Sequence, residues 1–237
     1  MTTPTEPPVT LVTGAASGIG AATARLLLDA GHHVAVTGRD AARLEAFAAT
    51  LPDDGAARLI TVVADASVQP DVERAVADTV TAFGRLDAVV ANAGFSSHDD
   101  VATGDPDAWR AMLDVNVLGP ALLVRTALPH LRETRGRIVM VGSVAGIRNT
   151  PGNMYSVTKW ATRALAENTR LLTVPDGVGV TLIAPGRVDT EFWAARGGTP
   201  PGPVLGPDDV ARTIAWALDQ PSDVAIDEVV IRPLGQL

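Results

Sequence analysis

Val9-Thr10-Leu11-Val12-Thr13-Gly14-Ala15-Ala16-Ser17-Gly18-Ile19-Gly20 is the stretch that decides the fold. Residues 9–13 are typical of a short buried strand, and residues 21–30 predict a helix that ends at Gly31. A glycine-rich turn between a first strand and a helix lets backbone N–H groups approach a pyrophosphate at the helix N-terminus. The spacing is Gly-x3-Gly-x-Gly, and on this motif alone a tight turn without a ligand remains the alternative.

The rest of the chain repeats this alternation of strand and helix. Short apolar runs predict strands at 33–37, 59–63, 87–91, 137–141, 178–184 and 228–232. Helical patterns lie between them, at 40–51, 70–83, 107–132, 152–172 and 208–218. We therefore expect an α/β, Rossmann-type fold, a doubly wound parallel sheet of about seven strands with helices on both faces. Residues 9–237 are expected to form a single dinucleotide-binding catalytic domain, after a flexible N-terminal arm at 1–8.

Composition excludes several classes of partner. The 237 residues carry a net charge of −8 and no run of Lys or Arg, so we expect no nucleic-acid partner. Cysteine is absent and the four histidines show no ligand spacing, so no metal site is predicted. The first ten residues lack the pattern of a signal peptide, and no apolar run approaches the roughly 18 residues of a membrane span. We expect a cytoplasmic protein without a membrane partner.

Six residues each stand at or just past the end of a different predicted strand: Gly14, Arg39, Asp65, Asn92, Ser143 and Pro185. Parallel strands bring these ends to one edge of the sheet, where open α/β sheets bind their ligands. Arg39 follows Gly38 at the strand end that meets an adenosine ribose, and a guanidinium there suits a 2′-phosphate. NADP is therefore favoured over NAD, although Asp40 weakens the argument and a surface arginine is the alternative.

Two of these strand ends leave alternatives open. Asp65 either reaches the adenine amino group or caps the turn into the next helix. Asn92 is interpreted as mainly structural, because its amide can tie neighbouring strand ends together, whereas Gly94 is expected next to the cofactor.

Tyr155 and Lys159 are the only tyrosine and the only lysine in the chain, against 18 arginines. Residues four apart share one face of a helix, so the phenol and the ammonium are expected side by side. A position that keeps lysine in a chain that otherwise uses arginine indicates a need for a compact ammonium. The alternative is a solvated lysine beside a packing tyrosine.

Asn116 lies on the apolar stripe of the helix predicted at 107–132, and Pro120 follows four residues later. Proline has no N–H for the carbonyl of residue 116. We therefore expect a bend there, with a free Asn116 carbonyl that can hold a water molecule. A tolerated kink without function is the alternative.

These motifs together resemble the short-chain dehydrogenase/reductase family in its compact single-domain branch, over nearly all of the chain from Val9 onward. The carriers are Thr13 to Gly20, Asn92-Ala93-Gly94, Asn116, Ser143, Tyr155-x3-Lys159 and Pro185-Gly186-x-Val188-x-Thr190. The resemblance implies an oxidoreductase that transfers a hydride between NADP(H) and a carbonyl or secondary alcohol. It implies a catalytic tetrad of Asn116, Ser143, Tyr155 and Lys159. The implied cofactor contacts are Thr13, Gly14, Ser17, Gly18, Ile19, Gly20, Arg39, Asp65, Asn92, Ala93, Gly94, Tyr155, Lys159, Pro185, Gly186, Val188 and Thr190.

The resemblance also assigns roles to the tetrad. Tyr155 is the general acid/base, and we expect the Lys159 ammonium and the positive nicotinamide to lower the pKa of its phenol. Lys159 also holds the nicotinamide ribose, and Ser143 stabilises charge on the substrate oxygen. The Asn116 carbonyl binds a water that links Lys159 to solvent.

The substrate is predicted only as a class. Candidate pocket residues are Phe95, Ser96, His98, Ala145, Ile147, Asn149, Met154, Phe192 and Trp193. This mainly apolar set suggests a ketone or alcohol with a hydrophobic body, in a fairly open cleft with a small lid at 187–206. The resemblance implies a homo-oligomer, a tetramer or dimer. The alternatives are an NAD-dependent alcohol dehydrogenase of the same family, or a non-catalytic nucleotide-binding scaffold on the same fold.

Overall fold

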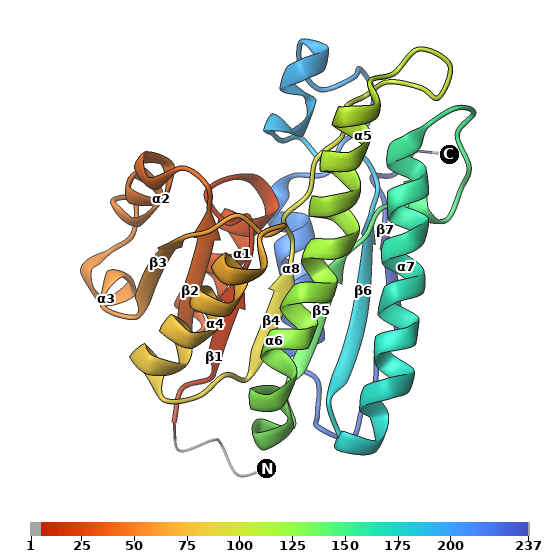
Figure 1. Cartoon of the computed structure of the whole chain (residues 1–237). Coiled ribbons are helices and arrows are strands. Elements are labelled where there is room, and N and C mark those ends of the chain that lie inside the picture. Colours follow the sequence, from red (N-terminus) through yellow and green to blue (C-terminus); the bar gives the residue numbers. More distant parts are fainter. Residues whose placement is uncertain (1–5, 237) are drawn as a thin grey trace.

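The computed structural model describes residues 6–236 and contains one sheet of seven strands, all parallel, in the order β3-β2-β1-β4-β5-β6-β7 (Figure 1). The strands are β1 (Val9–Val12), β2 (His33–Gly38), β3 (Leu59–Val63), β4 (Ala88–Ala91), β5 (Arg137–Val141), β6 (Gly179–Pro185) and β7 (Glu228–Ile231). The order reverses between β1 and β4, which is the point where sheets of this type open a crevice for a ligand. The predicted Rossmann-type fold is confirmed.

Helices cover both faces of the sheet, as Figure 1 shows. One face carries α4 (Gln69–Phe83), α6 (Gly119–Thr134) and α7 (Met154–Thr173). The other face carries α1 (Gly18–Asp29), α2 (Ala41–Ala48) and α8 (Pro207–Leu218). The shorter elements are α3 (Asp53–Ala56), α5 (Pro106–Leu113), η1 (Asp114–Leu118), η2 (Val144–Gly146), η3 (Val174–Asp176) and η4 (Glu191–Arg196).

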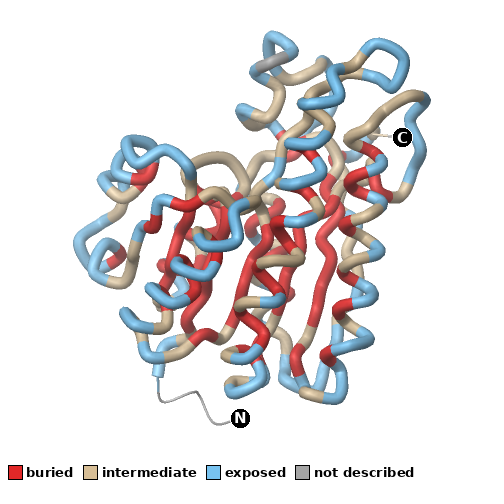
Figure 2. Tube along the Cα trace, viewed as in Figure 1, coloured by how far each residue is buried: buried red, intermediate tan, exposed pale blue. Residues whose placement is uncertain are grey.

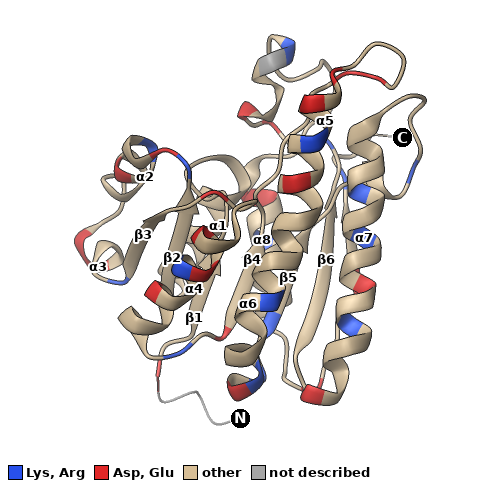
Figure 3. Ribbon diagram, viewed as in Figure 1, with Lys and Arg blue, Asp and Glu red and all other residues tan. Residues whose placement is uncertain are grey.

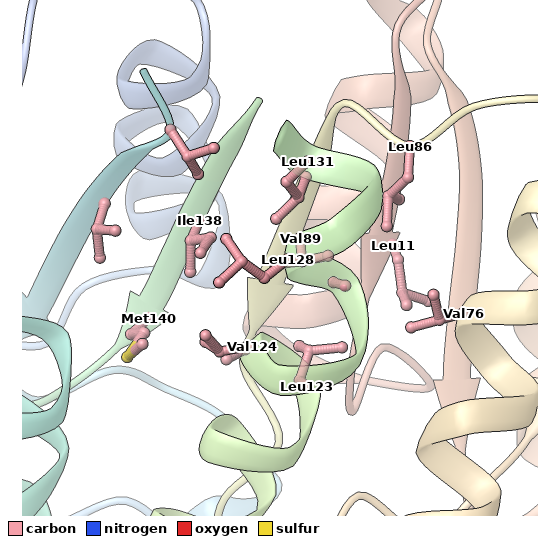
Figure 4. Close-up of a cluster of buried hydrophobic side chains, with 14 of the residues drawn as sticks. Leu11, Val76, Leu86, Val89, Leu123, Val124, Leu128, Leu131, Ile138 and Met140 are labelled. Atoms are coloured by element: carbon pink, nitrogen blue, oxygen red, sulfur yellow. The ribbon is translucent and has the colours of Figure 1, made fainter. Parts of the chain in front are cut away.

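The core lies in two layers, one on each face of the sheet, because successive side chains of a strand point to opposite faces. On β5, Ile138 and Met140 enter the layer under α4 and α6, whereas Val139 and Val141 enter the other layer. Figure 4 shows the first layer, in which Leu123 and Leu131 of α6 lie close to strand residues. Figure 2 shows the strands as the buried centre of the molecule.

Charged residues lie mainly on the helices and loops, and the central strands carry almost none (Figure 3). By length and composition alone the stretch Pro106–Thr134 could cross a membrane, although the sequence pattern predicted no span. Half of its most apolar 18 residues are buried inside the molecule, and the stretch packs on the sheet. Such a composition is expected of a helix that covers a sheet core.

Two predicted helices differ from the structure. The helix predicted at 107–132 is divided into α5 and α6 by η1, a π-helical turn that widens the helix just before Pro120. The helix predicted from Asp40 to Leu51 ends at Ala48, although the Asp40 side chain caps it as expected, accepting from the Arg43 N–H at 3.2 Å. Of the arm predicted at 1–8, residues 1–5 lie outside the described residues; the Pro8 carbonyl accepts from the His33 N–H at 2.9 Å.

Candidate active site

A cleft of about 940 Å³ runs along the carboxyl ends of the strands. It is lined by most of the predicted cofactor contacts, namely Gly14, Ser17, Gly18, Ile19, Arg39, Asp65, Asn92, Ala93, Gly94, Tyr155, Lys159, Pro185, Gly186, Val188 and Thr190. Of the other predicted catalytic and substrate residues, it is lined by Ser143, Phe95, Phe192 and Trp193. Thr13, Gly20, Asn116, Asn149 and Met154 are outside this lining.

The β1–α1 turn needs its glycines. Gly14 and Gly18 have φ angles of +64° and +55°, which side chains disfavour, and a Cβ on Gly14 would lie 2.7 Å from the Cα of Ala93. Ser17 is the N-cap residue of α1, but its side chain makes no capping hydrogen bond. The first N–H groups of α1 therefore face the cleft without a side-chain partner and suit an anionic ligand.

Thr13 and Asn92 join the ends of β1 and β4 below the cleft. The Asn92 amide donates to the carbonyls of Thr13 and Gly14, at 3.0 Å each, and the Asn92 N–H donates to Thr13 Oγ1 at 3.1 Å. Asn92 thus makes the structural contacts that its position predicted. Gly20 packs against the same turn, where a Cβ would collide with the Gly14 carbonyl.

Arg39 stands at the rim of the cleft with 74% of its side chain exposed, and its nearest acidic partner is Asp65, at 4.0 Å. The Asp65 carboxylate is held by the N–H and hydroxyl of Ser67, at 2.8 and 2.6 Å. Asp65 therefore caps the turn that leads into α4, which is one of its two predicted roles, while the N-cap residue of the helix itself is Val68. Arg39 remains a solvent-facing cation at the end of β2.

Tyr155 and Lys159 lie on one face of the first turns of α7. The Asn153 side chain caps this helix by accepting from the Ser156 N–H at 3.0 Å. Lys159 is 5% exposed; its Nζ donates to the Val141 carbonyl at 2.8 Å and lies 5.7 Å from the centre of the Tyr155 ring. The alternative of a solvated lysine is therefore excluded.

Burial dominates the titration of both groups. It raises the pKa of the Tyr155 phenol to about 12, and the Ser143 hydroxyl acts weakly in the opposite direction. It lowers the pKa of the Lys159 ammonium to about 8. The expectation that Lys159 lowers the pKa of Tyr155 is wrong for the protein alone, because Lys159, with a pKa of about 8, is already neutral at the pH where the phenol ionises. The effect of the positive nicotinamide stays a prediction.

Asn116 is 1% exposed and lies behind the cleft, on η1. Its side chain accepts from the Phe95 N–H at 3.0 Å and donates to the Phe95 carbonyl at 2.9 Å and to Thr158 Oγ1 at 3.0 Å. Its carbonyl lies 2.9 Å from Thr162 Oγ1, whose one hydrogen is shared with the Thr158 carbonyl, also at 2.9 Å. The predicted free carbonyl is therefore wrong: Pro120 withholds its N–H as expected, but a threonine of α7 supplies a donor.

Gly94 lies against two of the predicted catalytic residues, Asn116 and Lys159. A Cβ at this position would lie 3.1 Å from Asn116 Oδ1 and 3.6 Å from Lys159 Nζ. The four predicted catalytic residues therefore form one cluster around Gly94 and the end of β5, with three of them in the cleft and Asn116 directly behind.

The substrate side of the cleft is aromatic. Phe95, Phe192 and Trp193 line it, and so do Ser96, His98 and Ala145 from the candidate pocket list. Asn149 is exposed in the loop after η2 and does not line the cleft. Met154, the first residue of α7, is outside the lining although its neighbours Asn153 and Tyr155 are part of it.

Sequence reasoning missed several residues of the cleft. Arg43 of α2 forms an ion pair with Glu191 of η4 across its mouth. Gln236 accepts from the Arg187 N–H at 2.9 Å, and a side chain on Gly186 would collide with it. A usable signal existed for Gln236, since any segment that follows a last parallel strand arrives at the ligand edge of the sheet.

The fold and cleft define an α/β protein with a tyrosine, a serine and a lysine gathered at its ligand edge, and comparisons with known proteins identify its family. A family model described as short chain dehydrogenase matches residues 8–199. An uncharacterized oxidoreductase of Staphylococcus saprophyticus is 36% identical over 233 residues, which cover 95% of this chain and 97% of that protein.

Solved structures agree. An alcohol dehydrogenase from the archaeon Thermococcus sibiricus, complexed with 5-hydroxy-NADP, has a TM-score of 0.90 at 32% identity, covering 98% of this chain and 99% of that chain. A 3-ketoacyl-(acyl-carrier-protein) reductase from Brucella melitensis, complexed with NADH, has a TM-score of 0.86 at 28% identity, covering 96% and 97%. The chain belongs to the short-chain dehydrogenase/reductase family and is an oxidoreductase.

Proposed function

We propose that this oxidoreductase transfers a hydride between NADP(H) and a ketone or secondary alcohol, with Tyr155 as general acid/base. The observation that carries the proposal is the meeting of Tyr155, Ser143 and Lys159 in the cleft that begins at the glycine-rich β1–α1 turn. When bound, the nicotinamide supplies or accepts the hydride. The protein's own residues position the two reactants and move the proton.

The cleft fits such a dinucleotide along its length. Gly14, Ser17, Gly18, Ile19 and Gly20 would place backbone N–H groups around the pyrophosphate, because the turn leaves no room for side chains. Asp65 stands near the adenine end, and Ala93 and Gly94 follow the end of β4. At the other end the nicotinamide would lie among Pro185, Gly186, Val188 and Thr190, all of which line the cleft.

The three tetrad residues that line the cleft have separate tasks. A Tyr155 phenol with a pKa of about 12 stays protonated at neutral pH and can donate its proton to a carbonyl oxygen; in the reverse direction the phenolate takes the proton from the alcohol. Ser143 Oγ accepts from the Ala145 N–H at 3.1 Å, which leaves its own hydrogen for the substrate oxygen. Lys159 gives one hydrogen to Val141 and has two more for ribose hydroxyls.

Arg39 supports NADP over NAD, because its exposed guanidinium at the end of β2 suits a 2′-phosphate. NAD is the second candidate, since the Brucella melitensis reductase is complexed with NADH and Asp65 stands 4.0 Å from Arg39. The proposal also includes a cytoplasmic location and a homotetramer or dimer.

Replacing Tyr155 with Phe tests the reaction. We expect NADPH to bind with an unchanged dissociation constant, since the ring and its packing are kept, and ketone reduction to fall at least a hundredfold. Binding is measured by calorimetry and turnover by NADPH absorbance over a panel of ketones. Unchanged turnover in the variant would overturn the mechanism. NADPH binding with no turnover by the unaltered protein on any ketone or alcohol would favour the scaffold instead.

A further inference from the structure

His98 connects the two loops that border the substrate side of the cleft. It lies between β4 and α5, and its Nε2 is 2.9 Å from the carbonyl of Phe192, 94 residues later in the chain. A carbonyl can only accept, so Nε2 carries the hydrogen. The bond is available to neutral and to protonated histidine alike. His98 therefore tethers η4 to the β4–α5 loop.

The tether brings the His98 ring into contact with the aromatic rings of the cleft. The His98 ring stacks on Trp193 with centroids 5.5 Å apart and meets Phe192 edge-on at 5.0 Å. Phe192 in turn lies 5.4 Å from the Tyr155 ring. Trp193 Nε1 donates to the Val188 carbonyl at 2.9 Å, which fixes the indole. The wall next to the acid/base tyrosine is thus made of rings held in fixed positions.

The β4–α5 loop is built to hold His98 in place. His98 has a φ of +58°, a left-handed conformation that costs a residue with a side chain some free energy. Its N–H donates to Ser96 Oγ at 3.0 Å, and the neighbouring Asp99 accepts from Ser97 Oγ at 2.5 Å and from Trp109 Nε1 at 3.1 Å. These bonds offset the strain and anchor the loop to α5.

Aromatic residues are scarce in this chain, which contains four Phe, four Trp and one Tyr. Phe95, Tyr155, Phe192 and Trp193 all line this one cleft. Such a concentration beside the reacting group favours a flat substituent, because ring pairs gain stability beyond the area they bury.

We propose that His98, Phe192 and Trp193, together called the aromatic clamp, make the enzyme selective for aryl ketones and aryl-substituted secondary alcohols. Phe192 and Trp193 would contact the substrate ring, and His98 would act as a positioning residue that holds both. The inference rests on the proposed function for the presence of the carbonyl. A flat ring is expected to be preferred over a saturated ring of equal carbon number by roughly two- to tenfold.

The test compares substrates that differ only in ring saturation. Acetophenone and cyclohexyl methyl ketone are assayed for kcat/KM with NADPH. 1-Phenylethanol and 1-cyclohexylethanol are titrated into the NADPH-loaded enzyme by calorimetry, where cofactor and alcohol are both reduced and no hydride can pass, so the readout depends neither on turnover nor on the conjugation of the carbonyl. We expect the phenyl compound to bind roughly two- to tenfold more tightly.

Three variants assign the preference to the clamp. Phe192→Leu keeps apolar volume without a flat ring and should bring the binding ratio close to one, with unchanged NADPH affinity. His98→Gly removes the ring and the tether while glycine suits the left-handed backbone, and it should raise KM for acetophenone more than it lowers kcat. Phe83→Leu, in α4 against His33 and outside the cleft, is the matched control and should leave the ratio unchanged.

The outcomes separate this inference from the reaction itself. Equal binding of the two alcohols by the unaltered enzyme, or an unchanged ratio in Phe192→Leu, would overturn the clamp even if ketones are reduced. Preferential binding of 1-phenylethanol without any turnover would support the clamp and count against the proposed reaction.

Discussion

The buried Lys159 ammonium lowers the stability of the folded protein. A buried ammonium loses its hydration, and the single bond to Val141 restores only part of it. The chain uses arginine at its other 18 cationic positions, yet the guanidinium is larger and cannot share the space beside Gly94 and Asn116. A compact charge that faces the cleft therefore matters more here than stability.

The cost of this charge predicts how stability depends on pH. Burial lowers the pKa of Lys159 from 10.5 to about 8, so the unfolded chain binds the proton more tightly than the folded protein. Between pH 8 and 10.5 the folded protein releases the proton first, and its stability rises with pH. Lys159→Met should remove this rise, which amounts to at most about 3 kcal/mol.

Urea denaturation of both proteins at several pH values measures the effect as the difference in unfolding free energy. The range from pH 8 to 9.5 avoids the titration of Tyr155, whose raised pKa acts in the opposite sense at higher pH. A variant that shows the same rise as the unaltered protein would mean that Lys159 is not the titrating group.

Arg39 is tested through cofactor preference. Arg39→Asp should weaken NADPH binding by about ten- to a hundredfold, because a charge-assisted bond to the 2′-phosphate is replaced by repulsion. NADH binding should change by less than about threefold. Arg110→Asp, at an exposed arginine of α5 outside the cleft, is the matched control for net charge. Equal losses for both cofactors would show that Arg39 does not read the 2′-phosphate.

At the scale of the elements, η1 joins α5 and α6 to the site. The π-helical turn places the Asn116 side chain on Phe95 and its carbonyl on Thr162 of α7. Thr162→Val removes that donor and leaves a buried carbonyl short of a partner, which should destabilise the protein by about 1–3 kcal/mol. Because η1 also carries Asn116, the rate of ketone reduction should fall together with the stability. Thr162→Ser should restore both the rate and the stability.

Thr79→Val is the matched control for this change. Thr79 is also fully buried, but its hydroxyl donates to Ala75 within its own helix, so its removal breaks no contact between elements. Denaturant titrations of the four proteins give the comparison. If Thr162→Val lowers the free energy of unfolding no more than Thr79→Val does, the bond to Asn116 stabilises the protein no more than a bond within one helix.

Strands were predictable from sequence, whereas the form of the helix interruption was not. The prediction at 137–141 coincides with β5, because a buried parallel strand is a continuous apolar run between turn residues. The interruption at η1 was anticipated at Pro120, but its form was not. A proline predicts a missing donor, whereas the choice between a kink and a π-helical turn depends on what α7 offers across the gap.

The site residues also divide into those that the sequence pattern located and those that depend on the path of the chain. Residues fixed by their place at a strand end, such as Gly14, Ser143 and Pro185, were found where the pattern put them. Asn149 and Met154 were predicted as pocket residues, but Asn149 is exposed in the loop after η2, and Met154 is outside the lining although its neighbours Asn153 and Tyr155 are in it. The tether of His98 to Phe192 joins two loops 94 residues apart and had no local signal.

At the scale of the whole molecule, helices rather than strands are exposed, and some of that surface is apolar. On α7, Val157 is 51% exposed and Leu171 60%, with Trp160 between them on the outward side. The opposite side of α7 packs on the sheet, so these three residues face away from it. Large apolar residues exposed on one side of a helix are typical of an interface between subunits, even where polar residues such as Glu167 and Asn168 lie among them.

We therefore expect a dimer or tetramer that uses the outer side of α7. Light scattering coupled to gel filtration should give two or four times the monomer mass for the unaltered protein. Val157→Glu combined with Trp160→Glu should give the monomer, because two carboxylates would have to be buried in the contact. Val63→Glu, at an equally exposed apolar residue of edge strand β3, is the control and should leave the mass unchanged. A monomeric unaltered protein, or a double variant that still assembles, would contradict this interface.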